Sequence, residues 1–248
     1  PLDYLWDGTH QDDDLFENLQ SAFVGADGTG YFFGDNCYVI YSDGKFSARE
    51  LIGDDWGMLP SQFSQKIDAA CVHPRGMTYL FTGDRYIRYS TSDYRHIDDG
   101  YPKSILQDLR QEPGFENLPP EFEVQAGELN RGEAPVLLNA VVVNSRHIYL
   151  FMGGDCYISS SAPTATYDIN ILGHQRNHLA ETGDVDAAVV INGKTYLFSG
   201  DQYVRYSEAI YDEVDAGYPK RLTTGLLADL QRDIENTLVN APANALAI

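Results

Sequence analysis

The stretch Asp186–Ser207 reads DAAVVINGKTYLFSGDQYVRYS, and its pattern decides the fold class. An Asp and two small residues lead through a short turn to the run Tyr-Leu-Phe, and a Gly-Asp turn then leads into Tyr-Val-Arg-Tyr. Short runs of β-branched and aromatic residues between such turns are typical of antiparallel strands. The stretch therefore predicts one small antiparallel sheet.

The same pattern occurs four times along the 248 residues. The lead residues of the four repeats lie 47, 71 and 47 residues apart, and they are Ser21, Asp68, Asn139 and Asp186. A period near 47 with three or four strands in each repeat is typical of a β-propeller and not of a helical solenoid. One such sheet cannot bury both of its faces, so the repeats are expected to pack around a common axis. The sequence predicts an all-β, four-bladed β-propeller with short peripheral helices.

The spacing also divides the chain into segments. Residues 1–19 form an acidic tail, 20–222 the propeller, and 223–248 a C-terminal helix and tail. The blades are predicted at about 20–66, 67–135, 136–184 and 185–222. The second blade includes an inserted loop at 103–135, in which a helical turn is expected at Ser104–Arg110. The C-terminal helix is predicted from leucines and an isoleucine at helical spacing, and it is expected to pack on a blade edge or to serve as a partner helix.

Repeats two and four share a longer motif than repeats one and three. Both contain Gly-Asp-x-Tyr-Φ-Arg-Tyr-Ser (where Φ is an apolar residue), followed by Gly-Tyr-Pro-Lys, and these features are absent from the other two repeats. Arg88 and Arg205 therefore occupy equivalent positions. Each holds an acidic turn of its own blade, or the two form a pair of symmetric anion sites.

The composition limits the kinds of partner. The chain contains 17 Lys and Arg against 37 Asp and Glu, a formal charge of −20. Such a charge repels a nucleic-acid backbone and favours cationic partners such as metal ions, polyamines or basic proteins. No run of 18 apolar residues occurs, so no membrane span is predicted. No signal peptide is visible, and the compartment, secreted or cytosolic, stays open.

Catalytic chemistry is not indicated by any motif. The sequence contains no nucleophile elbow, phosphate-binding loop, dinucleotide fingerprint or zinc-protease helix, so no enzymatic activity is predicted. Cys37, Cys71 and Cys156 lie far apart in the sequence and are expected to be reduced, buried thiols. Cys71 and His73 could form a dyad, but the other repeats carry neither residue.

One histidine pair has the spacing of a ligand site. His174 and His178 are four residues apart, which on a helix would place both imidazoles on one face for zinc or haem iron. No carboxylate or thiol is spaced to complete such a site. The alternative is an exposed polar connector.

The repeats resemble the hemopexin-like repeat family. The resemblance rests on Asp-Ala-Ala at the start of repeats two and four, on Tyr-Leu-Phe with Gly-Asp-x-Tyr-Φ-Arg-Tyr, and on the closing Gly-Tyr-Pro. Trp56–Pro60 is similar to the family's linker between blades, and the resemblance covers about 20–222. It implies a single disk-like propeller with a channel ion held mainly by main-chain oxygens, with water completing its shell, and a chloride in the same channel. No cysteine lies in the fourth blade, so the first-to-last disulfide of vertebrate members is absent, which favours plant seed albumins or microbial relatives.

The residues at the axis fit this implication. Innermost strands crowd a narrow axis, where small residues are needed, and the alanines that follow the four lead residues meet that need. The lead residues would present a ring of backbone carbonyls, which suits Ca²⁺ or Na⁺. The metal site is thus predicted at Ser21, Asp68, Asn139 and Asp186. The alternative is that Asp68 and Asp186 only turn the chain through side-chain hydrogen bonds.

Two functions follow from these features. The first is a non-enzymatic binding module, stabilised by the channel ion, that recognises a small ligand or a protein partner. The second is a storage or defence albumin, or a lectin-like protein, that binds polyamine, glycan or haem. In the haem-carrying member of the family, haem lies between two propellers, so a single chain lacks one face that a homodimer would supply.

Overall fold

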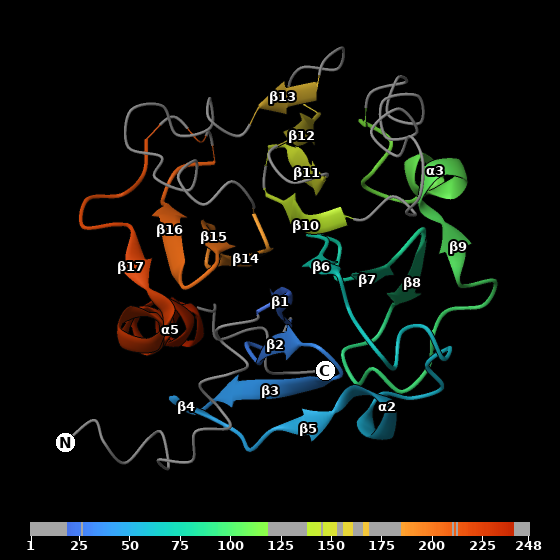
Figure 1. The fold of residues 1–248 in the computed structure, drawn as a ribbon, viewed down its shortest axis with the longest axis horizontal. Coiled ribbons are helices and arrows are strands. Elements are labelled where there is room, and N and C mark those ends of the chain that lie inside the picture. Colours follow the sequence, from blue (N-terminus) through green and yellow to red (C-terminus); the bar gives the residue numbers. More distant parts are fainter. Residues whose placement is uncertain are drawn as a thin grey trace.

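The computed structural model contains four antiparallel sheets arranged around a common centre (Figure 1). It describes residues 19–25, 27–118, 138–144, 146–152, 156–160, 166–168, 185–209, 211 and 213–240. In each sheet the strand that comes first in the sequence lies at the centre, and the later strands follow outward. The prediction of a mainly β protein built from four repeats is confirmed.

The first sheet has five strands and a short helix after them. Its strands are β1 (Ser21–Val24), β2 (Gly30–Gly34), β3 (Cys37–Ser42), β4 (Lys45–Phe46) and β5 (Glu50–Leu51). Both β4 and β5 pair with β3. The helix α2 (Ile52–Asp55) leads to the buried Trp56, which packs between the first and second sheets.

The second and fourth sheets are built alike, with four strands each. The second contains β6 (Ala69–Val72), β7 (Thr78–Thr82), β8 (Arg85–Tyr89) and β9 (Lys103–Ser104). The fourth contains β14 (Ala187–Ile191), β15 (Lys194–Ser199), β16 (Gln202–Tyr206) and β17 (Lys220–Arg221). A helix follows each outer strand, but the two differ in length. They are α3 (Ile105–Asp108), which continues as the 3₁₀ turn η1 (Leu109–Gln111), and α5 (Leu222–Asn240).

The third sheet also has four strands. They are β10 (Leu138–Val143), β11 (Ile148–Met152), β12 (Cys156–Ser159) and β13 (Thr166–Asp168). The register between β10 and β11 shifts at Asn139, between Leu138 and Ala140. One lead residue of the repeats therefore lies at a bulge in its strand.

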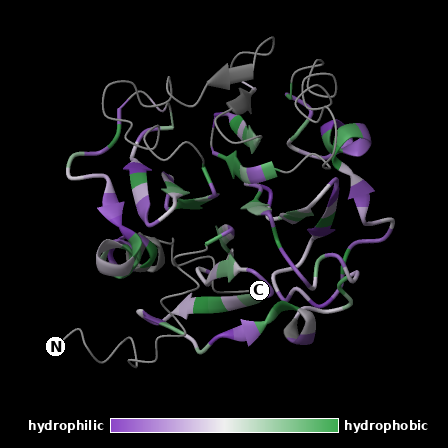
Figure 2. Ribbon diagram, in the orientation of Figure 1, coloured by the Kyte–Doolittle hydropathy of each residue, from purple (hydrophilic) through white to green (hydrophobic). Residues whose placement is uncertain are grey.

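Four hydrophobic clusters join neighbouring sheets. One cluster lies between the first and second sheets, one between the second and third, one between the third and fourth, and one between the fourth and first. Figure 2 shows the consequence, because the inner strands are largely hydrophobic whereas outer strands such as β9 and β17 are hydrophilic. Each sheet thus buries both faces against its two neighbours, which is why the repeat is not stable alone.

The helix α5 contributes to the cluster between the fourth and first sheets. Leu226, Leu230 and Ile234 are buried there, which confirms the predicted helix and its packing. The side-chain amide of Gln231 also donates to the carbonyl of Gly44 in the turn between β3 and β4. The last helix of the chain is thereby attached to the first sheet.

The strand register corrects the sequence alignment of the first repeat by one residue. The residues that pair with the Phe at the same position of the second strand are Ser21, Ala69, Ala140 and Ala187. The backbone N–H of Gln20 donates to the Phe33 carbonyl, as that of Asp68 donates to Phe81. Gln20, and not Ser21, therefore corresponds to Asp68. The first repeat has only one alanine, Ala22, where the second has Ala69 and Ala70. The sequence alone therefore does not show whether Ala22 corresponds to Ala69 or to Ala70, and the strand pairing shows that it is Ala70.

Candidate functional site at the centre of the four sheets

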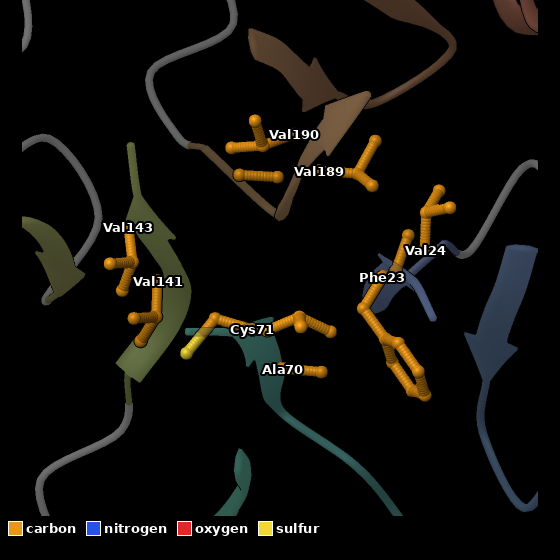
Figure 3. A pocket seen from close by; sticks show the side chains of 11 residues that line it. Phe23, Val24, Ala70, Cys71, Val141, Val143, Val189 and Val190 are labelled. Carbon is orange, nitrogen blue, oxygen red and sulfur yellow. The ribbon is translucent and has the colours of Figure 1, made fainter. Parts of the chain in front are cut away.

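The four inner strands β1, β6, β10 and β14 surround a cavity at the centre of the molecule (Figure 3). It contains about 260 Å³ of empty space, part of which is open to solvent. Two rows of equivalent residues supply most of its wall, and they are Ala22, Ala70, Val141 and Ala188, then Val24, Val72, Val143 and Val190. All eleven lining side chains are apolar or a thiol, so these side chains offer no hard ligand to an ion in the middle of the cavity.

Polar backbone groups are nevertheless directed toward this centre. Each inner strand is the edge strand of its sheet and is hydrogen-bonded to one neighbour only. An edge strand leaves alternate N–H and C=O groups without strand partners. Four such edges therefore converge on one axis, and their free groups need partners other than strands.

The predicted metal residues lie at one end of these strands. Asp68, Asn139 and Asp186 each come directly before the first paired alanine of an inner strand, and Gln20 takes this position in the first sheet. The register brings these four backbone positions to the same mouth of the cavity. Ser21, predicted for the ring, lies one position further along β1, where it is 1% exposed.

The carboxylates of the two aspartates are engaged with their own sheets. Asp68 Oδ2 accepts a hydrogen bond of 2.8 Å from the backbone of Gly83, and Asp186 Oδ2 accepts one of 2.7 Å from Gly200. Lys66 Nζ lies 2.8 Å from the other oxygen of Asp68. Both carboxylates thus fix the turn that follows the second strand of their sheet. Because these carboxylates already have partners, main-chain oxygens are the better candidates for ligands at the mouth.

Sequence reasoning missed Gln20 as a residue of this site. Its side-chain Nε2 donates to Asp35 Oδ1 over 3.1 Å, so it contacts the turn after the second strand, as Asp68 does in the second sheet. An amide in place of a carboxylate reverses the hydrogen bond from acceptor to donor. The signal that could have identified it is the Gly-Asp turn at Gly34, which follows Gln20 at the same distance as Gly200 follows Asp186.

The equivalent arginines are held within their own blades, as one of the two interpretations predicted. Arg88 pairs with Asp98 and Glu112. Arg205 pairs with Asp215 and Asp233. Neither guanidinium is available as the centre of an anion site without breaking these pairs.

The remaining candidate side chains that the structure describes do not assemble into a second site. His174 and His178 lie outside the described residues. Cys37 and Cys71 are free and buried, and burial raises the pKa of both thiols. His73 Nδ1 accepts a hydrogen bond from the backbone of Arg75.

Among the residues that the structure describes, no group of three or more His, Cys, Asp or Glu side chains is placed to hold a metal. Within the same part of the chain, no helix combines the length and the hydropathy that a membrane crossing requires.

Known proteins share this architecture. The sequence profile of the family described as Hemopexin matches residues 67–109 and 185–225, which cover the second and fourth sheets. No curated protein matches the chain. The structure of the hemopexin fold protein CP4 from cow pea is 17% identical over 88% of this chain and 97% of that chain, with a TM-score of 0.60.

Two further solved structures are similar at the same level. A 2S albumin seed protein from Dolichos is 19% identical, over 88% of this chain and 99% of that chain, with a TM-score of 0.61. A plant lectin with two metal binding sites from Cicer arietinum is 19% identical, over 90% of this chain and 99% of that chain, with a TM-score of 0.58. The four sheets thus have the hemopexin fold. The chain itself carries hemopexin repeats in its second and fourth sheets, which confirms the resemblance predicted from the sequence.

Proposed function

We propose that this protein is a non-enzymatic binding module whose four sheets form a closed four-bladed propeller with a structural cation on its axis. Ca²⁺ is the proposed ion and Na⁺ the alternative. The ion would bind the folded state only, so it would stabilise the closed arrangement of the four sheets. The ligand or protein partner would be recognised on the surface around the cavity mouth.

The convergence of four edge strands on one axis carries this proposal. Their unpaired backbone groups would repel one another at close approach unless a bound species neutralised them. A hard cation takes six to eight oxygen ligands, and main-chain carbonyls with water supply such a set. The N–H groups of the same edges would hold the chloride that the resemblance implies.

The residues at the mouth fit main-chain ligation better than side-chain ligation. The Asp68 and Asp186 carboxylates are occupied by Gly83, Gly200 and Lys66. Their backbone carbonyls, with those of Gln20 and Asn139, would hold the cation. The apolar wall beyond the mouth would keep the ion at the end of the channel, because an ion gains nothing from valine and alanine side chains.

Glycan recognition is the second candidate function. It is favoured by the structural similarity to a lectin with two metal binding sites, in addition to the seed albumins. A lectin-like protein with this charge would bind neutral or cationic sugars and would repel acidic ones. Polyamines and haem are the remaining small ligands considered, with haem requiring the second face of a homodimer.

Thermal unfolding of the purified protein tests these proposals together. The protein is stripped with EDTA, exchanged into choline chloride buffer and unfolded with and without CaCl₂ or NaCl. An ion at 100 times its dissociation constant should raise the melting temperature by about 5–10 °C. An unchanged melting temperature in both salts would contradict the axial ion.

The ligand is tested on the same protein once its ion is bound. Haem, spermine and a panel of sugars are added, and red-cell agglutination is measured alongside. A sugar that raises the melting temperature and blocks agglutination identifies a lectin. A shift with spermine that disappears in high salt identifies a polyamine binder, and no shift with any of them contradicts small-ligand binding.

A further inference from the structure

The start of β1 contains two buried oxygen atoms that have no hydrogen-bond partner. They are Ser21 Oγ and Gln20 Oε1. The Ser21 residue is 1% exposed, so bulk water does not reach the hydroxyl. A buried polar atom without a partner is destabilising, and its presence in a folded protein indicates a missing ligand, water or ion.

The Ser21 hydroxyl is specific to the first sheet. The position of Ser21 is occupied by alanine in the other three sheets, at Ala69, Ala140 and Ala187. Packing around the axis therefore needs only a methyl group at this position, and the serine adds one oxygen to it. The hydroxyl is not needed to complete any hydrogen bond within the sheet.

The second oxygen results from the amide at position 20. Asp68 and Asp186 use their carboxylates to accept backbone N–H groups of the following turn. Gln20 instead donates its Nε2 to Asp35, which leaves its Oε1 without a donor. The first sheet thus offers two buried neutral side-chain oxygens at the start of its inner strand, whereas Asp68 and Asp186 offer carboxylates that are already hydrogen-bonded.

We infer that Ser21 Oγ is a side-chain ligand of the cation at this mouth, contributed by the first sheet alone. The inference rests on the proposed axial ion and adds to it one residue that the repeat pattern does not supply. A hydroxyl oxygen is a hard, neutral ligand of the kind that Ca²⁺ and Na⁺ accept. The ligand set is therefore asymmetric although the four sheets are arranged symmetrically, with Gln20 Oε1 as a second acceptor beside it.

The Ser21→Ala variant tests this inference because it should raise the stability of the ion-free protein and lower its affinity for calcium. Without ions, the variant loses a buried unpartnered hydroxyl and gains the residue of the other three sheets, so its melting temperature should rise by about 2–4 °C. With CaCl₂, it should bind with about tenfold lower apparent affinity than the unchanged protein, measured from the melting temperature against ion concentration. Ser64→Ala, which removes a hydroxyl bonded to Ser61 far from the axis, is the matched control and should leave the calcium response unchanged.

The outcomes separate this inference from the proposal on which it rests. If the unchanged protein responds to calcium and Ser21→Ala responds equally, the axial ion stands and Ser21 is not its ligand. If the unchanged protein does not respond to Ca²⁺ or Na⁺, the axial ion itself is contradicted. A calcium response that falls in Ser21→Ala and not in Ser64→Ala supports both.

A change of ion preference gives a second readout that a packing role would not produce. Ser21→Cys replaces the hard oxygen by sulfur, which prefers soft ions such as Cd²⁺. The variant should gain stabilisation by Cd²⁺ over Ca²⁺ relative to the unchanged protein, which already contains Cys37, Cys71 and Cys156 and so controls for other thiols. Equal cadmium responses in the two proteins would overturn direct ligation.

Discussion

The second and fourth sheets carry the same sequence motif but anchor it to different carboxylates. In both sheets three tyrosines, one arginine and one lysine at equivalent positions surround a buried acidic centre, and in the fourth sheet Lys194 and Arg232 add two further cations. In the second sheet this centre is Glu112, which follows the short turn η1. In the fourth sheet it is the pair Asp229 and Asp233 on the long helix α5.

The single carboxylate of the second sheet has many partners. Glu112 accepts hydrogen bonds from Tyr86, Tyr101, Lys103 and Arg88 over 2.6–2.9 Å, and it is 1% exposed. Burial alone would raise the pKa of Glu112, but the hydrogen bonds from Lys103 and the tyrosines outweigh it and lower the pKa. The carboxylate is therefore charged, and its hydrogen bonds hold the side chains at the outer edge of this sheet together.

In the fourth sheet two carboxylates, Asp229 and Asp233, accept the hydrogen bonds that Glu112 alone accepts in the second sheet. Asp229 accepts from Tyr203, Tyr218 and Lys220. Asp233 accepts from Tyr196, and Lys194 lies 2.8 Å from it. Arg232 on the same helix contacts both aspartates. The pKa of each is lowered, because hydrogen bonds from the basic and tyrosine side chains outweigh burial.

The difference shows what the motif itself encodes. The repeated residues supply donors, and the acceptor comes from whatever segment follows the sheet. In the fourth sheet that segment is also the helix that packs against the first sheet. Its anchoring therefore bears on the contact between the fourth and first sheets, which would close the proposed propeller, whereas that of Glu112 bears on one sheet edge.

The largest effect is expected from removing both charges on α5. The double variant Asp229→Asn, Asp233→Asn removes the carboxylates that Lys194, Lys220 and Arg232 face and one of the two that Arg205 faces. It should lower the free energy of unfolding by about 5 kcal/mol. Urea denaturation measures it. Asp201→Asn, which breaks an exposed pair with Arg221, is the control and should cost less than about 1 kcal/mol. A double variant no less stable than this control would contradict the role of the helix in closure.

A smaller loss is expected at the equivalent centre of the second sheet. Glu112→Gln keeps the shape but removes the charge that Arg88 and Lys103 face, and it should cost about 3 kcal/mol. The exposed Glu208→Gln is the control for the substitution. If Glu112→Gln destabilises as much as the double aspartate variant, the distinction between a local and a closing anchor is wrong.

Acid should weaken both centres in the same direction. Their carboxylates have pKa values lower in the folded state than in the unfolded chain, where they titrate near 4. They therefore contribute stability that is complete above about pH 5 and is lost as pH falls toward the folded-state pKa values. The free energy of unfolding, measured between pH 6 and pH 3, should fall less steeply in Glu112→Gln than in the unchanged protein. Parallel curves would show that Glu112 contributes nothing to acid sensitivity.

The smallest expected effect is a difference in the free energy of unfolding between the Arg88→Lys and Arg205→Lys variants. Arg88→Lys loses one of the two ion pairs and the contact over the Tyr101 ring, and should cost about 1–2 kcal/mol. Arg205→Lys should cost less, because Lys194 and Arg232 still neutralise Asp233. Chemical denaturation of the two variants in parallel measures the difference. A larger loss in Arg205→Lys than in Arg88→Lys would show that the additional partners of Asp233 do not compensate for the change at Arg205.

Much of this fold was predictable, because the same pattern of strands and turns occurs four times in the sequence. Strand runs, Gly-Asp turns and the equivalence of Arg88 with Arg205 are all present in the sequence. The acceptors of the two networks were not predictable, since Glu112 lies in an insertion and Asp233 lies on α5, a helix much longer than the one that follows the second sheet. Their partners are brought near only by tertiary packing.

The residues that precede the inner strands were predicted correctly in three sheets and were off by one residue in the first. Asp68 and Asp186 were placed there because the Asp-Ala-Ala motif marks them. Gln20 was missed because a single alanine gives no register, and only the pairing of Ser21 with Phe33 fixes it. Side chains that depart from the repeat, such as the Ser21 hydroxyl, become visible only when the other three sheets show what that position requires.

The most direct test of the account is a crystal structure of the protein grown with CaCl₂ and recorded at a wavelength where calcium scatters anomalously. We expect one peak on the axis, at the mouth formed by Gln20, Asp68, Asn139 and Asp186, about 2.3–2.6 Å from their main-chain oxygens. A closed ring of four sheets would surround it, and Ser21 Oγ would lie within the same distance. An axis without an anomalous peak, or a calcium ion held by carboxylates elsewhere, would contradict the central claim.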